Sequence, residues 1–193
     1  MKKTENNYCN FTFSHYENVL KNALSKGYVI SKLEGYEKNI KNKKIIVLRH
    51  DVDFSLILAL RIAKIENKTG IKSTFFLRVH GKYNLFSYNN YMVLNQIISM
   101  GHEIGLHHEC GFANLFGNKE EKMINKEKMI LETITGLRIK GVSLHEPART
   151  GHKLTKGTIK NLGFSYDAYS AKFTKDIKYI SDSSSRWREG CMC

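Results

Sequence analysis

One stretch decides the fold of this chain, and it reads IIVLRHDVD over residues 45–53. Its first half is a short apolar run rich in β-branched residues, which predicts a buried strand over residues 44–48. Two carboxylates separated by one residue, Asp51 and Asp53, follow that strand. Because alternate residues of an extended chain share a face, these two carboxylates are expected to point the same way. The stretch therefore predicts a buried strand that ends in a pair of acidic side chains.

Helix-like and strand-like segments alternate outward from this stretch toward both ends of the chain. Further strands are predicted over residues 73–79, 103–106, 140–144, 164–169 and 177–180. Helices are predicted over residues 16–24, 56–65 with Ser55 as the cap, 90–100, 119–135 and 154–162. This repeated β-α alternation predicts an α/β fold with a parallel sheet, either open or closed into a barrel. No linker-like tract interrupts the chain, so residues 1–193 are interpreted as one domain, with 1–43 as a lead-in and 44–193 as the core.

Polar side chains follow four of the predicted strands at the point where each strand ends. Besides the two aspartates, they include His107 and His108, then His145 and Arg149, and finally Asp182. Pro147 and Trp187 stand in the last two of these stretches. Chemistry in parallel α/β folds gathers at the carboxyl ends of the strands. Imidazole and carboxylate groups are good zinc ligands, and a second carboxylate nearby can accept a proton from metal-held water. The sequence therefore predicts a site for metal-assisted hydrolysis.

Structural roles compete with these functional ones. The paired aspartates could cap the helix that begins near Ser55, and His107 could be a hydrogen-bonded core histidine. In an extended chain His108 faces opposite to His107, so a structural role is favoured for His108. The same alternation favours a packing role for His50, and His102 lies at the far end of its strand.

The charge and the cysteines limit the partners and the location. The chain carries 31 Lys and Arg against 18 Asp and Glu, a formal net charge of +13, and the excess is spread over both ends. Nucleic-acid binders concentrate basic residues on one face with aromatic residues between them, so no nucleic-acid partner is expected here. No apolar run is long enough for a membrane span, and none resembles a secretory signal. The four cysteines form no CxxC pair, and Cys191 and Cys193 are too close for an ordinary disulfide, so a reduced, cytoplasmic setting is expected.

In combination, these motifs resemble those of the NodB-type polysaccharide deacetylases (carbohydrate esterase family 4), in the branch whose first motif reads Arg-His-Asp-Val-Asp. That motif is residues 49–53 here. Residues 73–77 are similar to the family's second core strand, 101–107 to its GHEIG-x-H segment, 143–147 to its third motif, and 182–187 to its fourth. The matches follow the family's order over residues 45–190.

The resemblance implies a distorted (β/α) barrel that removes an acyl group, usually N-acetyl from an amino sugar. It implies that the paired aspartates divide two roles, with Asp51 as the base and Asp53 as a metal ligand, and the reverse assignment stays open. His107 falls on the first metal-binding histidine of the family. The cofactor is expected to be one divalent metal, zinc first, with cobalt, nickel or iron as alternatives. The supporting or substrate-binding residues would be Arg49, His108, Pro147, Arg149, Asp182 and Trp187.

Three departures from the family pattern limit what the resemblance implies. The position of the family's second metal-binding histidine holds Gly111, so His108 or His145 must supply that ligand. His145 itself stands where the family usually has an arginine. The chain stops at Cys193 without the further strand whose histidine acts as general acid, so the barrel is expected to be incomplete at its C-terminus.

The expected function is therefore that of a metal-dependent hydrolase acting on an amino sugar or a nucleotide-sugar intermediate of surface polysaccharide synthesis. Two alternatives keep the same fold. One is a truncated or catalytically degenerate binding domain, and the other is an amide hydrolase with a non-sugar substrate. Metal content and turnover are the measurements that separate these functions.

Overall fold

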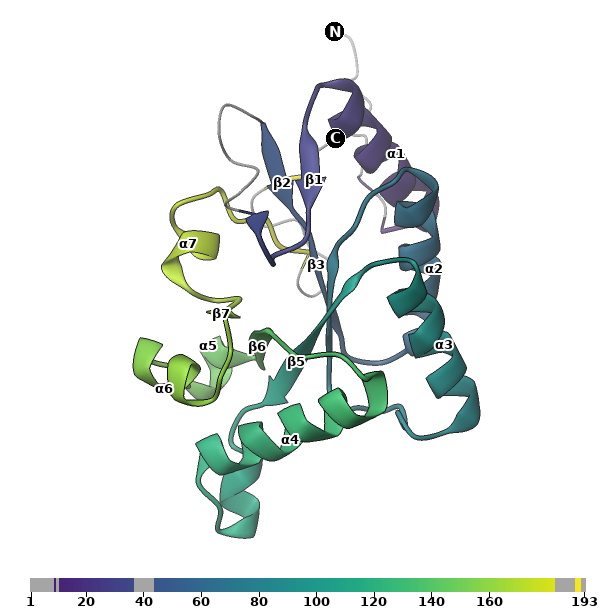
Figure 1. Cartoon of the computed structure of the whole chain (residues 1–193). Helices are drawn as coiled ribbons and strands as arrows, with labels where there is room; N and C mark the ends of the chain where they lie inside the picture. Colours follow the sequence, from purple (N-terminus) through teal and green to yellow (C-terminus); the bar gives the residue numbers. More distant parts are fainter. Residues whose placement is uncertain (1–8, 10, 37–43, 183–189, 192–193) are drawn as a thin grey trace, which may run out of the picture.

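Seven parallel strands form the framework in a computed structural model that describes residues 9, 11–36, 44–182 and 190–191 (Figure 1). Five of them form one sheet in the order β3 (Arg49–Val52), β4 (Thr74–Leu77), β5 (Glu103–Glu109), β6 (Gly141–His145) and β7 (Tyr166–Asp167). A second parallel pair consists of β1 (Val29–Ser31) and β2 (Ile45–Val47). Only Leu48 separates β2 from β3, so one stretch of chain pairs first with β1 and then with β4. The predicted parallel α/β fold is confirmed.

Four helices lie on one side of this framework. The helices α2 (Leu56–Lys68), α3 (Tyr88–Ser99) and α4 (Glu120–Thr135) follow β3, β4 and β5 in turn, and α1 (Phe13–Ser25) lies against α2 (Figure 1). The apolar sides of α2, α3 and α4 meet the sheet in a main core, which includes Leu56, Phe75, Leu94, Leu106 and Ile124. Burial of this apolar surface is the main force that holds the helices to the sheet.

The opposite face of the sheet carries a second, smaller core of Leu33, Tyr36, Phe76, Tyr166, Ala168 and Phe173. Two glycines make room for its aromatic rings. A Cβ atom on Gly105 would lie 2.4 Å from the ring of Phe76, and one on Gly141 would lie 2.3 Å from the ring of Tyr166. These positions therefore need glycine because of close packing, whatever the backbone conformation.

The five-stranded sheet curves until its first and last strands approach each other. Arg49 in β3 donates a hydrogen bond of 3.2 Å to the carbonyl oxygen of Ala168, which directly follows β7. The smaller core fills the space that this curvature encloses. The arrangement is a distorted, partly closed barrel, as the family resemblance implied.

The structure corrects the predicted elements in four places. Residues 177–180 contain no strand, and β7 is an edge strand of the five-stranded sheet among the described residues. The strand predicted over 164–169 is only two residues long, whereas β5 is longer than predicted and runs on to Glu109. The sequence does not predict β1, because three residues are too few to show an alternating pattern.

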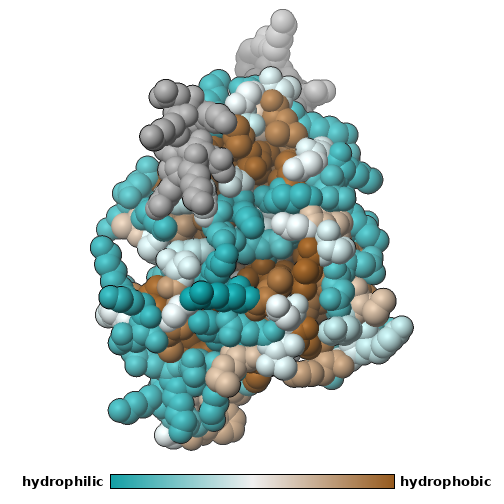
Figure 2. All heavy atoms as spheres, viewed as in Figure 1, coloured by the Kyte–Doolittle hydropathy of each residue, from teal (hydrophilic) through white to brown (hydrophobic). Residues whose placement is uncertain are grey.

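Short helices and the surface complete the description. The short elements are α5 (Pro147–Thr150), α6 (Lys156–Asn161), α7 (Ala171–Thr174) and a 3-10 helix at Phe112–Phe116. Hydrophilic residues separate the apolar surface into distinct patches on the face shown in Figure 2. In the part of the chain that the structure describes, no helix has both the length and the apolar character that crossing a membrane requires.

Candidate metal centre

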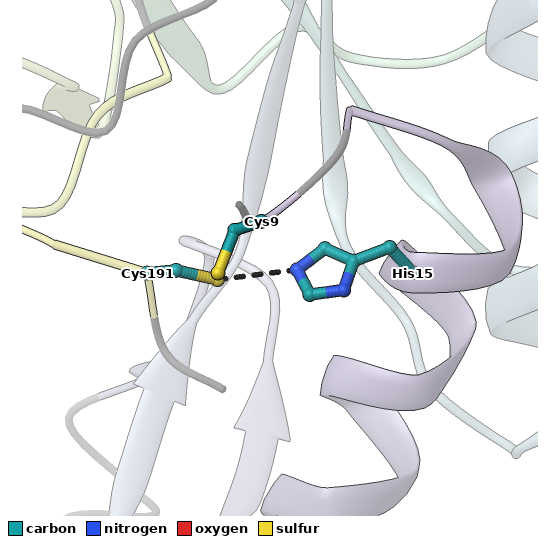
Figure 3. Close-up of side chains that lie close together, drawn as sticks. All are labelled: Cys9, His15 and Cys191. Atoms are coloured by element: carbon teal, nitrogen blue, oxygen red, sulfur yellow. Dashed lines mark hydrogen bonds between the residues drawn. The ribbon is translucent and has the colours of Figure 1, made fainter. Parts of the chain in front are cut away.

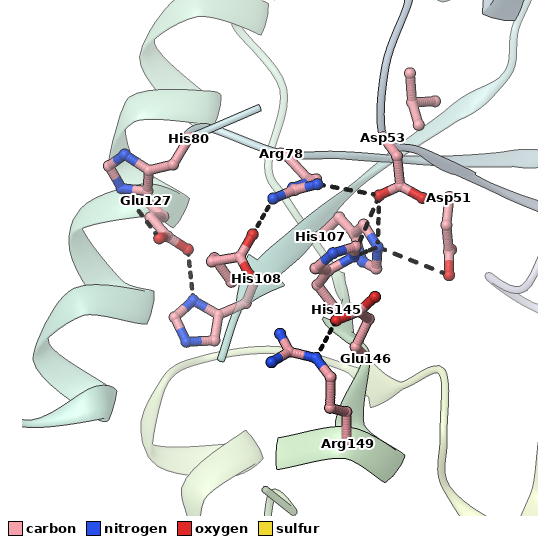
Figure 4. Close-up of polar contacts among 12 residues, drawn as sticks. Asp51, Asp53, Arg78, His80, His107, His108, Glu127, His145, Glu146 and Arg149 are labelled. Carbon is pink, nitrogen blue, oxygen red and sulfur yellow. Dashed lines mark hydrogen bonds and ion pairs between the residues drawn. The ribbon is translucent and has the colours of Figure 1, made fainter. Parts of the chain in front are cut away.

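Three side chains from three strands meet at the carboxyl edge of the sheet (Figure 4). Asp53 follows β3, His107 lies in β5, and His145 ends β6. The Oδ1 atom of Asp53 is 3.2 Å from Nδ1 of His145 and 3.4 Å from Nε2 of His107, and these two nitrogens are 3.2 Å apart. One potential ligand atom from each residue thus lies within 4.8 Å of the others, close enough for all three to bind one metal ion.

The backbone of β6 determines which nitrogen of His107 carries its proton. Nδ1 lies 3.1 Å from the carbonyl oxygen of Ser143, and this contact is a hydrogen bond only if Nδ1 is the donor. In the neutral ring Nε2 then presents a lone pair toward Asp53, whose carboxylate oxygen is also an electron-pair donor. Two facing lone pairs repel each other unless a proton or a metal ion lies between them. Metal-binding histidines commonly donate their other ring N–H to a backbone carbonyl in this way.

Asp51 lies beside this group but has other partners. Its Oδ2 accepts hydrogen bonds from Arg49 at 3.0 Å and from the Ser143 hydroxyl at 3.4 Å, and it lies 3.9 Å from Nε2 of His107. The Oδ1 atoms of Asp51 and Asp53 are both buried and have no hydrogen-bond partner among the described residues. A buried carboxylate oxygen without a partner is costly, so both carboxylates fit a site that binds a cation and its water.

Arg78 belongs to this site, and the sequence reasoning missed it. It is the first residue after β4, its guanidinium lies 3.5 Å from Oδ1 of Asp53, and it also pairs with Glu109. Burial alone would raise the pKa of Asp53, but the close contacts with His107, His145 and Arg78 hold that pKa below its usual value. Asp53 is therefore ionised at neutral pH, as a metal ligand must be. The rule that polar residues at strand ends form the site also applies to Arg78.

The chain turns sharply directly after His145. Burial, together with the positive charges nearby, lowers the pKa of His145, so its imidazole is neutral at neutral pH and able to bind a metal. Glu146 has a φ of 47° and a ψ of 48°, a left-handed conformation that is strained for any residue other than glycine. Pro147 then begins α5, and the exposed Arg149 pairs with Glu146 rather than with the metal-binding group.

His108 points to the other side of β5 and lies apart from this group. Its Nδ1 is 2.6 Å from Glu127 and its Nε2 is 2.7 Å from Glu120, so both ring nitrogens face carboxylates. Burial would lower the pKa of His108, but the two carboxylates outweigh this effect and raise it. Figure 4 shows His108 and Glu127 beside α4, away from Asp53. Of the two candidates for the ligand missing at Gly111, His145 is therefore the one that joins Asp53.

Of the two remaining predicted supporting residues, the structure describes only Asp182. Because residues 177–180 form no strand, Asp182 is not delivered to the carboxyl edge of the sheet. It is exposed and lies near Tyr16 of α1, where its charge adds to the larger effects of burial and of Glu66 in raising the pKa of the phenol. Trp187 lies outside the described residues.

The remaining core histidines have structural partners, as predicted. Nε2 of His50 is 2.6 Å from a carboxylate oxygen of Glu66, and this carboxylate also accepts a hydrogen bond from Ser73. His102 is buried against the same group, with Nδ1 3.5 Å from Glu66. This cluster lies on the helix side of the sheet and is separate from the candidate metal centre.

Proteins of known structure with a similar fold are polysaccharide deacetylases. One from Bacillus cereus superposes with a TM-score of 0.55 over 79% of this chain and 48% of that chain, at 15% identity. A protein from Bacillus anthracis described in the same terms gives a TM-score of 0.56 over 79% and 48%, at 14% identity. A chitin deacetylase from the fungal pathogen Colletotrichum lindemuthianum gives 0.46 over 63% and 53%, at 16% identity. No family model and no curated protein matches the chain.

The two Bacillus comparisons show that this chain has the polysaccharide-deacetylase fold, which the sequence resemblance predicted. With identities of 14% and 15%, they show the fold alone. The chain spans about half the length of these two solved structures, since it covers 48% of each. Its activity and its substrate therefore have to be argued from the site.

Proposed function

We propose that this chain is a metal-dependent hydrolase that removes an acyl group, N-acetyl first of all, from an amino sugar or a sugar intermediate of surface polysaccharide synthesis. The observation that carries the proposal is the convergence of Asp53, His107 and His145 beside a second, half-buried carboxylate, Asp51. The polysaccharide-deacetylase fold supports an acylated amino sugar as the substrate class.

The residues of the site divide into metal ligands and a base. Asp53, His107 and His145 would hold one divalent ion, and zinc suits a set of two imidazoles and one carboxylate. Such an ion, when bound, lowers the pKa of a coordinated water and polarises the acyl carbonyl. The Oδ1 atom of Asp51, which has no hydrogen-bond partner among the described residues, would accept the proton of the attacking water.

The neighbouring residues keep the base in position. Arg49 and Ser143 both bind Oδ2 of Asp51, which leaves Oδ1 to face the reacting atoms. After it has accepted a proton, the same carboxyl group would return that proton to the departing amine. Arg78 contacts Asp53 in a corresponding way and holds the ligand carboxylate in its ionised form.

Metal content and acetate release together test this proposal. Untagged wild-type protein should contain one equivalent of metal that Asp53→Ala and His107→Ala both lose, whereas Asp51→Asn should keep the metal and lose turnover. Glu146→Gln is the matched control, because Glu146 adjoins His145 in the chain but pairs with Arg149. Elemental mass spectrometry measures the metal. Acetate release from N-acetylglucosamine oligomers and from UDP-N-acetylglucosamine measures turnover.

The possible outcomes separate the proposed function from its alternatives. Equal metal content in all four variants would rule out the assigned ligands. If the metal content depends on Asp53 but no acetate is released from any substrate, the result would favour the non-catalytic binding domain. Acetate release from a simple N-acetylated amine but not from sugars would favour an amide hydrolase with a non-sugar substrate.

A further inference from the structure

A second group of metal-ligating side chains lies where the two ends of the described chain come together (Figure 3). It consists of Cys9, His15 in the first turn of α1, and Cys191. Nε2 of His15 is 3.3 Å from Sγ of Cys191, and one ligand atom from each of the three residues lies within 4.8 Å of the others. Figure 3 shows both sulfur atoms on the same side of the imidazole ring, which they face.

The chemistry of this group suits a tetrahedral zinc ion. Zinc bonds to thiolate sulfur at about 2.3 Å and to imidazole nitrogen at about 2.0 Å, which places ligand atoms roughly 3.4–3.8 Å apart around a tetrahedron. The distance of 3.3 Å between Nε2 of His15 and Sγ of Cys191 is close to this range, and the other ligand atoms lie within 4.8 Å of one another. Two thiolates and a neutral imidazole also balance the charge of a divalent ion. This set has two sulfur ligands, whereas the candidate centre at Asp53 has none.

We propose that Cys9, His15 and Cys191 bind one zinc ion, which links the N-terminal segment and the start of α1 to the C-terminal segment. Three protein ligands leave the fourth position of the tetrahedron for water or another group. Cys193 lies outside the described residues and is not counted as a ligand here. The proposal does not depend on the proposed hydrolase activity, because the two sites share no residue.

Conservative substitutions can remove these ligands without removing the start of the helix. Thr12 caps α1 by accepting a hydrogen bond from the backbone N–H of His15, so His15→Asn keeps that bond. Cys9→Ser and Cys191→Ser change one atom each in partly exposed side chains. Cys110→Ala is the matched control, because Cys110 is a buried cysteine that is not a member of the cluster.

The test measures metal in untagged protein that has been purified with a reductant. Wild-type protein should contain one more equivalent of zinc than Cys9→Ser, Cys191→Ser or His15→Asn, and Cys110→Ala should match the wild type. After cobalt replaces zinc, a thiolate-to-cobalt charge-transfer band in the near ultraviolet should be present in wild type and in His107→Ala, and absent from Cys9→Ser. Circular dichroism of each variant shows whether it is folded.

Two results would overturn this second site. One is a folded Cys9→Ser or His15→Asn variant that keeps the wild-type zinc content and the cobalt band. The other is a disulfide between Cys9 and Cys191 in the reductant-purified protein, detected by peptide mass mapping without reduction. Loss of metal in Asp53→Ala with retention of the cobalt band would show that the two sites fill independently, and failure of the hydrolase site would leave this zinc site intact.

Discussion

The two faces of β5 use the same residue types for different purposes. On the inner face, His107 meets Asp53 and His145 with its unprotonated nitrogen, and electron-pair donors converge. On the outer face, His108 lies between Glu127 and Glu120 at 2.6 Å and 2.7 Å, so that each nitrogen can donate to a carboxylate. A histidine beside carboxylates can therefore form either a metal site or an ion pair, and the match of donors to acceptors decides which.

The largest expected effect comes from breaking the outer-face pair. His108→Leu removes a partner of Glu127, whose side chain is only 1% exposed. Breaking a buried ion pair by removing one member costs about 3–5 kcal/mol, so the free energy of unfolding should fall by about that amount. Urea denaturation of the metal-free protein measures this change.

The inner-face histidine supplies the matched control for that experiment. His107→Leu should change the free energy of unfolding of the metal-free protein by about 1 kcal/mol or less, since it removes one hydrogen bond to a carbonyl and relieves the facing lone pairs. The same variant should lose the bound metal, which His108→Leu should keep as long as it is folded. Equal destabilisation by the two substitutions would contradict the contrast between the faces.

The next largest effect on stability tests how tightly side chains pack on the inner face of β5. A methyl group at Gly105 would lie 2.4 Å from the ring of Phe76, so Gly105→Ala should lower the free energy of unfolding by about 1–3 kcal/mol through overpacking. Gly157→Ala in α6 is the control, because its nearest neighbour would be 3.6 Å away and alanine favours a helix by about 0.5–1 kcal/mol. Thermal melting of both variants measures the difference. An unchanged melting temperature for Gly105→Ala would show that the inner core is loosely packed.

The pH dependence of stability sharpens the description of the outer-face pair. The pKa of His108 is raised in the folded protein. Its contribution to the free energy of unfolding is therefore complete below the pKa of the unfolded state, 6.5, and is lost as pH rises through the pKa of the folded state. Burial would raise the pKa of Glu127, but His108 and His80 lower it. The contribution of Glu127 to the free energy of unfolding is therefore lost as pH falls below 4.5. Relative to a variant with both His108→Leu and Glu127→Leu, the wild type should be most stabilised between pH 4.5 and 6.5.

Unfolding of the wild type and of this double variant across pH measures the effect. The difference in their free energies of unfolding should shrink as the solution becomes alkaline. A difference that does not vary with pH would mean that the imidazole of His108 is not charged in the folded protein.

The sequence predicted the order of the elements because each main strand and helix has its own local pattern. The apolar run at 45–48 and the helix that begins after Ser55 are such cases. Residues 177–180 are also partly apolar but pair with no strand, so such a pattern is not by itself enough to form one. The close packing of the smaller core was equally hidden, because the need for glycine at positions 105 and 141 is seen only when their neighbours are known.

The candidate site was predictable to the extent that it follows from strand direction and alternation. These two rules place Asp53 and His107 at one edge and turn His108 away from them. They do not show that His145 approaches Asp53, because this distance depends on the curvature of the sheet. The carbonyl of Ser143, which sets the proton on His107, carries no signal in the sequence, since every residue has a carbonyl.

The smallest expected effect tests whether Asp53 caps the N-terminus of α2 or belongs to the candidate metal centre. The structure gives the capping role to Ser55, whose Oγ accepts a hydrogen bond of 3.3 Å from the backbone N–H of Leu58. Ser55→Ala should therefore cost about 1 kcal/mol in the free energy of unfolding, and Ser55→Asp should restore most of it. Asp53→Asn should leave the stability of the metal-free protein nearly unchanged, because its amide oxygen can still face Arg78. If chemical denaturation showed Asp53→Asn to be as destabilising as Ser55→Ala, then Asp53 would be part of the helix cap, and its place among the metal ligands would lose its main support.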